Sequence, residues 1–203
     1  MRILIIDNYD SFVYNIVGLL REIRHGGAIP VLEWDVRLND DVDLQEIPLY
    51  DAVILSPGPG LPCEAGKMPE VLERFAESIP MFGICLGFQA IAERFGGRLT
   101  QLPSPRHGHK SHLRNIDRSD PVTGPLADSC PAVGRYHSWI VDPASLPASL
   151  VATSYDEEGN IMSLRHVKHP LFGTQFHPES IISTHGRTIL EAFLQYAIAT
   201  ERR

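Results

Sequence analysis

The feature that most constrains this chain is a cysteine held between two glycines directly after an apolar run. Residues 81–84 are typical of a buried strand, and the amphipathic sequence after Cys85 is typical of a helix. Glycines at 83 and 87 permit a sharp turn and close helix approach, as in the G-x-S-x-G elbow that presents a nucleophilic serine. Cys85 would then lie at a helix N-terminus, which favours the thiolate. Taken alone, a buried packing cysteine is an equally good interpretation.

A histidine and a carboxylate two residues apart follow a second apolar run, which ends at Phe176. Residues i and i+2 of an extended segment point to the same side, so Glu179 is placed to orient the imidazole of His177. A thiol, a base and an orienting acid are the parts of a covalent acyl-transfer site. By itself, the His-x-Glu pair also fits a surface loop or an incomplete metal site.

The first half of the chain alternates apolar runs with helical patterns. The expected strands cover 3–6, 29–34, 51–55 and 81–84, and the expected helices run from about 12 to 25, 68 to 78 and 86 to 95. This alternation predicts an α/β fold, an open and mostly parallel sheet with helices on both faces. The length fits a single domain over residues 1–203.

The second half changes to short apolar stretches separated by turns. These lie at 98–102, 132–141, 150–155 and 161–165, and the last two are predicted to form a hairpin. We expect a small antiparallel annex that returns His177 and Glu179 to the mouth of the sheet, and a final helix over about 184–199. The His-rich run 106–112 is predicted to be a solvated loop rather than an anion site.

A Ser-Pro-Gly-Pro-Gly loop at 56–60 follows the third predicted strand. Open α/β sheets gather their ligands at the carboxyl ends of parallel strands, where this loop is expected. We predict that the N–H groups of Gly58 and Leu86 form an oxyanion hole, since Leu86 is the residue after the nucleophile. A plain Pro/Gly turn is the alternative.

Composition excludes several classes of function. The net charge of −7 makes nucleic acid an unexpected partner, and no apolar run reaches the ~20 residues of a membrane span. No secretory signal is expected at the N-terminus. Three cysteines without C-x-x-C spacing argue against a disulfide framework or zinc site and favour the cytoplasm, with Cys63 and Cys130 incidental.

Four dispersed motifs carry a family resemblance: G-I-C-L-G-F-Q at 83–89, S-P-G-P-G at 56–60, R-Y-H-S at 135–138 and F-H-P-E-S at 176–180. In this order and spacing the chain resembles the class I glutamine amidotransferases, which have a flavodoxin-like sheet. Within that class it is most similar to the glutaminase subunit, component II, of anthranilate synthase and of aminodeoxychorismate synthase. The opening motif at 6–12 belongs to that branch, and the resemblance runs nearly end to end.

The resemblance implies a glutaminase that acts on L-glutamine through a γ-glutamyl thioester on Cys85, with His177 moving protons and Glu179 fixing its tautomer. The positions that match the family's glutamine-binding residues are Gly58, Pro59, Gly60, Gln89, Ser138 and Trp139. No cofactor is implied for this chain. Ammonia would pass to a partner subunit that binds chorismate and Mg²⁺, and that partner would decide whether anthranilate or aminodeoxychorismate is made.

The chain departs from the family pattern at two positions. Phe88 stands where the motif usually has His, which leaves its role beside Gln89 open, and Trp139 replaces an aliphatic residue whose contact is through backbone. His137 is either a structural histidine or a competing base. Two other functions stay open: a stand-alone γ-glutamyl hydrolase or peptidase, and a catalytically idle regulatory subunit.

Overall fold

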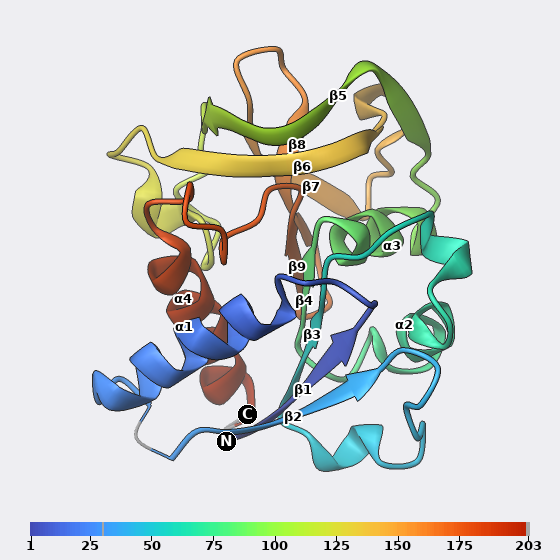
Figure 1. Ribbon diagram of the computed structural model, residues 1–203, viewed down its shortest axis with the longest axis vertical. Coiled ribbons are helices and arrows are strands. Elements are labelled where there is room, and N and C mark those ends of the chain that lie inside the picture. The colour runs from blue at the N-terminus through green and yellow to red at the C-terminus, as the bar shows by residue number, and fades with distance from the viewer. Residues whose placement is uncertain (30, 202–203) are drawn as a thin grey trace.

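A seven-stranded sheet forms the centre of the computed structural model, which describes residues 1–29 and 31–201 (Figure 1). Across the sheet the strands are β2 (Glu33–Leu38), β1 (Arg2–Asp7), β3 (Ala52–Leu55), β4 (Met81–Ile84), β9 (Leu171–Thr174), β8 (Ile161–His166) and β7 (Leu150–Tyr155). The first five strands in this order pair in parallel. Strand β8 then pairs antiparallel with β9, and β7 pairs antiparallel with β8. The prediction of a mostly parallel sheet is therefore confirmed.

Two helical layers cover the sheet. Helices α1 (Val13–His25) and α4 (Gly186–Glu201) pack on one face, and α2 (Met68–Phe75) and α3 (Leu86–Arg94) pack on the other. Successive side chains of β1 alternate between the layers, because Ile3 and Ile5 join the α1/α4 core whereas Leu4 and Ile6 join the α2/α3 core. Covering both faces explains why the central strands are continuous apolar runs.

A separate antiparallel pair crosses the carboxyl end of the parallel strands (Figure 1). It consists of β5 (Leu99–His112) and β6 (Ala132–Val141). The segment after β9 is tied to this pair, because the backbone N–H of His177 donates to the carbonyl of Gly134 at 3.0 Å. The small sheet therefore helps to bring the His-x-Glu motif over the parallel strands, as predicted.

The annex differs from the prediction in composition. The predicted hairpin of 150–155 and 161–165 is confirmed as β7 and β8, but this hairpin extends the main sheet through β9 instead of joining the annex. The loop predicted at 106–112 is wrong, because these residues form the second half of β5, which is mostly exposed apart from the buried Ser111. The ladder skips from Gln101 to Arg106, where two prolines interrupt the pairing.

Two element boundaries also differ from the prediction. The strand expected at 29–34 begins at Glu33 and ends at Leu38, and Pro30 lies outside the described residues. This strand is at the sheet edge, where polar side chains remain half exposed, so its sequence lacks a continuous apolar run. The helix expected over 68–78 ends at Phe75.

The order of the strands defines where a ligand site belongs. From β1 the parallel connections run to β2 on one side and to β3, β4 and β9 on the other. Such a reversal opens a crevice at the carboxyl ends of the strands.

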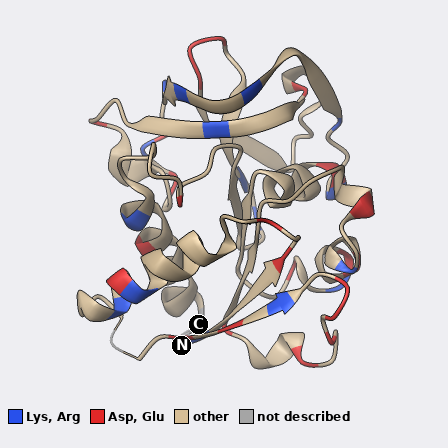
Figure 2. Cartoon of the chain, viewed as in Figure 1, with Lys and Arg blue, Asp and Glu red and all other residues tan. Residues whose placement is uncertain are grey.

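Lys and Arg are spread over both sheets and the helices rather than gathered on one element (Figure 2). None of the helices in the described residues is long and apolar enough to cross a membrane.

Candidate active site

The predicted elbow is present between β4 and α3. Cys85 adopts φ 50° and ψ −96°, a conformation that is rare for a residue with a side chain. Its backbone N–H donates to the carbonyl of Thr174 at 2.8 Å, which ties the turn to β9. A Cβ atom on Gly83 would collide with the backbone of Gly87, so the turn is closed as tightly as two glycines allow.

The predicted base and its orienting acid form a buried pair. Nδ1 of His177 lies 2.7 Å from Oε1 of Glu179, and both residues are nearly inaccessible to solvent. The rings of Phe12 and Tyr136 approach the imidazole at centroid distances of 5.3 and 5.0 Å. Within the described residues, Nε2 of His177 has no hydrogen-bond partner, so this nitrogen is free to exchange a proton.

The electrostatics of this pair favour a charged imidazole. Burial lowers the pKa of His177, but the sulfur of Cys85 and the carboxylate of Glu179 outweigh burial and raise the pKa above its ordinary value. The largest contribution that raises this pKa comes from the side chain of Cys85, so the sulfur acts on the ring. Catalytic hydrogen bonds often become aligned only when substrate binds.

All six predicted substrate positions line a single cavity of about 290 Å³. Cys85 opens into it from the elbow, the 56–60 loop forms one wall, and the small sheet forms another. The predicted residues in its lining are Gly58, Pro59, Gly60, Cys85, Gln89, Ser138 and Trp139. His177 and Glu179 are not part of this lining, which combines the sulfur of Cys85 with several polar groups.

The predicted oxyanion donors are two backbone N–H groups beside Cys85. Neither N–H of Gly58 and Leu86 has an acceptor among the described residues, and the N–H of Leu86 is at the first turn of α3. Gly58 is packed so closely that a Cβ atom there would collide with Asn8 and with the side chain of Leu86. The close approach of these three residues accounts for glycine at position 58.

Asn8 holds the 56–60 loop in place, a role that the sequence did not reveal. Its buried Nδ2 donates to the carbonyl of Ser56 at 2.9 Å, and its Oδ1 accepts from Nδ2 of Asn39 at 3.0 Å. Its backbone N–H donates to the hydroxyl of Ser56 at 2.9 Å. The opening motif is therefore connected directly to the predicted oxyanion loop.

His137 belongs to a buried polar chain rather than to the reactive pair. Its Nε2 accepts from Nε of Arg135 at 3.1 Å, and its Nδ1 lies 3.0 Å from the carbonyl oxygen of Trp139. Burial and the neighbouring charge of Arg135 lower the pKa of His137 to about 3. Arg135 is itself paired with Asp156 at 2.6 Å. These contacts favour the structural interpretation of His137, because a neutral ring with both nitrogens engaged is a poor base.

Phe88 points into the core. Its side chain is fully buried among the apolar residues between α3 and the sheet, including Leu55 and Leu86. It does not line the cavity, so a histidine is not needed there to contact a substrate. The sequence did not predict the cavity positions Gln101 and His107, which come from the strand that was expected to be a loop in its second half.

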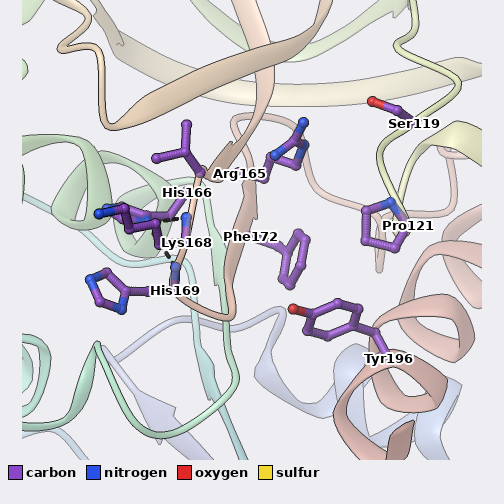
Figure 3. A pocket seen from close by; sticks show the side chains of 9 residues that line it. Ser119, Pro121, Arg165, His166, Lys168, His169, Phe172 and Tyr196 are labelled. Atoms are coloured by element: carbon purple, nitrogen blue, oxygen red, sulfur yellow. Dashed lines mark hydrogen bonds between the residues drawn. The ribbon is translucent and has the colours of Figure 1, made fainter. Parts of the chain in front are cut away.

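A second cavity, of about 240 Å³, lies near the start of β9 (Figure 3). It is lined by Ser119, Pro121 and Tyr196, by Arg165 and His166 at the end of β8, and by Lys168 and His169 in the turn that follows. None of the predicted site residues takes part in it. Across the described residues, no three His, Cys, Asp or Glu side chains are arranged to hold a metal ion.

Comparisons with known proteins show the family and the fold of this chain. A family model described as glutamine amidotransferase class-I matches residues 4–196, and the chain belongs to this family. A crystal structure of a protein described as one subunit of a GMP synthase, from Thermoplasma acidophilum, covers 100% of this chain and 96% of its own, with a TM-score of 0.85 and 24% identity. This likeness concerns the fold.

Several relatives carry more specific names. The chain is 40% identical to "Aminodeoxychorismate/anthranilate synthase component 2" of Bacillus subtilis, over 95% of each protein. It is 44% identical to "Anthranilate synthase component 2" of Azospirillum brasilense, over 95% of this chain and 94% of the relative. It also matches "Bifunctional protein TrpGD" of Thermotoga maritima at 40% identity, but spans only 32% of that longer protein.

Proposed function

We propose that this chain is a glutaminase subunit that releases ammonia from L-glutamine and passes it to a chorismate-binding synthase subunit. The product of the assembly is anthranilate or aminodeoxychorismate. The observation that carries the proposal is the placement of Cys85. The residue lies at a strained elbow and lines a polar cavity. Its side chain raises the pKa of His177, whose Nδ1 contacts the carboxylate of Glu179.

The first half of the reaction forms a thioester. The thiolate of Cys85 attacks the side-chain carbonyl carbon of glutamine, a C–S bond forms, and the carbonyl electron pair moves onto oxygen. When that pair returns, the C–N bond breaks and the nitrogen takes a proton from His177, leaving as ammonia. The raised pKa of His177 supports this role, because the ring carries the proton that the leaving group needs.

The second half releases glutamate. Water attacks the thioester carbonyl and gives a proton to the neutral imidazole, and the C–S bond breaks to restore the thiolate. Glu179 keeps Nδ1 of His177 protonated, so that Nε2 exchanges protons in both halves. The N–H groups of Gly58 and Leu86 would stabilise the oxyanion of each tetrahedral intermediate. Losing one such donor typically costs about 10²–10³ in rate.

The cavity wall supplies the polar groups for the rest of the glutamine molecule. Pro59, Gly60, Gln89, Ser138 and Trp139 line the cavity together with Cys85. A volume of about 290 Å³ suits a small amino acid better than a peptide. This lining favours free glutamine over γ-glutamyl peptides as the substrate.

A partner subunit would cover the mouth of this cavity. Large exposed side chains follow the motifs that build the site: Ile181, which is 99% exposed, comes two residues after Glu179, and Tyr9, which is 57% exposed, follows Asn8. Tyr14, in the first turn of α1, is 73% exposed. Exposed apolar side chains around a site are typical of a docking surface. The relatives' names, which call them component 2, agree with a second component.

One assay tests the proposal against its rivals. Glutamate release is measured from glutamine and from a γ-glutamyl peptide, for the wild type and Cys85→Ala, with and without a chorismate-binding partner. We expect release from glutamine only, a faster rate with the partner, and no release by Cys85→Ala. Rapid cleavage of the peptide without a partner would instead indicate a hydrolase, and no turnover in any arm would indicate an idle regulatory subunit.

A further inference from the structure

Gln175 is a buried amide that none of the proposed catalytic steps uses. It lies between the end of β9 and His177, and it is completely inaccessible to solvent. Its Nε2 lies 3.6 Å from Sγ of Cys85, within the range of an N–H···S hydrogen bond. Its Oε1 lies 3.2 Å from Nε2 of Gln89. A buried amide with one end on the reactive sulfur requires an explanation.

Arg135, which lies outside the cavity lining, fixes the direction of the hydrogen bonds that run through His137 to the carbonyl of Trp139. The guanidinium of Arg135 only donates, so Nε2 of His137, at 3.1 Å, must be the acceptor. The neutral His137 then carries its hydrogen on Nδ1 and donates to the carbonyl oxygen of Trp139 at 3.0 Å. Every group from Arg135 to this carbonyl therefore has a defined role as donor or acceptor.

The same carbonyl orients the two glutamine side chains. A carbonyl oxygen accepts only, so the amide group of Gln89 that lies 2.9 Å from Trp139 is its NH₂. The second hydrogen of this NH₂ faces Gln175, which must present its oxygen. The NH₂ group of Gln175 is left to face the sulfur of Cys85. The side chain is thus locked as a donor toward the sulfur.

We propose that Gln175 is a positioning residue that donates a hydrogen bond to Cys85, holding the sulfur at the cavity and stabilising its ionised form. This inference rests on the proposed function of Cys85 as the nucleophile. An N–H donor binds a thiolate more strongly than a thiol, because hydrogen bonds to charged acceptors are the stronger ones. The amide of Gln175 lies within hydrogen-bond distance of this sulfur, at 3.6 Å.

Other polar groups also lie near Cys85, and the test must leave them in place. His177, paired with Glu179, is one of these groups. His107 and His137 line the same cavity from the small sheet, and the first turn of α3 contributes its backbone N–H groups. Substitutions at Gln175 keep all of these groups, so a change in the thiol can be assigned to the amide.

The test measures the pH dependence of alkylation of Cys85 by iodoacetamide, followed on the Cys85 peptide by mass spectrometry. The peptide readout is needed because Cys63 and Cys130 are free and exposed. In Gln175→Leu the midpoint should rise by about one pH unit, the effect of losing one hydrogen bond to a charged group. In Gln175→Glu the rise should be larger, because a carboxylate of the same shape faces the thiolate. The kcat/KM for glutamine at neutral pH should fall about tenfold or more and recover as the pH rises.

Thr174→Val is the matched control. Thr174 is buried in the same segment, and its hydroxyl donates to the carbonyl of Phe176 at 3.0 Å without contacting the sulfur. This variant should keep the wild-type midpoint. A folded Gln175→Glu protein whose midpoint and kcat/KM match the wild type would overturn the proposal. Should the proposed function be wrong instead, the wild type with its partner would release no glutamate, while the alkylation midpoint would still shift in the Gln175 variants.

Discussion

Replacing Asn8 by alanine tests how the opening motif holds the predicted oxyanion loop. The substitution removes the hydrogen bond to the carbonyl of Ser56, the one accepted from Asn39 and a weaker contact to the sulfur of Met68, all of which are buried. Each buried group left without a partner costs about 1–3 kcal/mol. The backbone bond from residue 8 to the Ser56 hydroxyl survives. Two such groups lose their partner, so we expect the free energy of unfolding to fall by about 2–6 kcal/mol.

The same substitution should also lower the catalytic rate, because the side chain of Asn8 packs against Gly58. A loop that is free to shift misplaces one oxyanion donor, so kcat should fall by at least about tenfold while KM changes less. Urea denaturation and glutamate release with the partner present measure the two effects. Ser11→Ala, an exposed change in the same motif, is the control. A loss of stability below about 1 kcal/mol together with an unchanged kcat would refute this account of the loop.

Three further predictions concern single side chains. Glu179→Gln should lower kcat by about 10²-fold or more, because the imidazolium of His177 loses its charged partner; stopped assays of glutamate release at several pH values measure this. His137 is held neutral by its depressed pKa, so its contribution to stability is present above its unfolded pKa of about 6.5 and is lost as the pH falls toward about 3. Between pH 7 and 5 the wild type should consequently lose stability more steeply than His137→Gln, as followed by urea denaturation. Phe88→His should lower the free energy of unfolding by about 1–3 kcal/mol without raising kcat, because it places a polar ring in the core; a gain in activity would contradict the position of Phe88.

Local patterns in the sequence are sufficient for the parts of the fold that bury continuous apolar runs. The strands β1, β3 and β4 carry such runs because helices cover both of their faces, and their alternation with helices implies parallel pairing. The elbow at Cys85 and the His177–Glu179 pair are also readable, because tight turns and i, i+2 spacing are local properties.

The remaining features depend on contacts between distant segments. β2 lies at a sheet edge and needs no apolar run, and β5 contains two prolines that are typical of loops. Asn8 and Gln175 are polar residues whose roles come from partners that are 48 and 90 positions away in the chain. Only the three-dimensional structure brings these partners together, so no pattern around either residue predicts its role.

Trapping the covalent intermediate tests the central claim most directly. The chain, with its partner subunit, is mixed with glutamine, quenched in acid within the first turnovers, and digested for mass spectrometry. The account predicts that the peptide with Cys85 gains the mass of one γ-glutamyl group, and that the peptides with the exposed Cys63 and Cys130 do not. Glutamate release at a full rate with an unmodified Cys85 peptide, or an equal rate from Cys85→Ala, would contradict it.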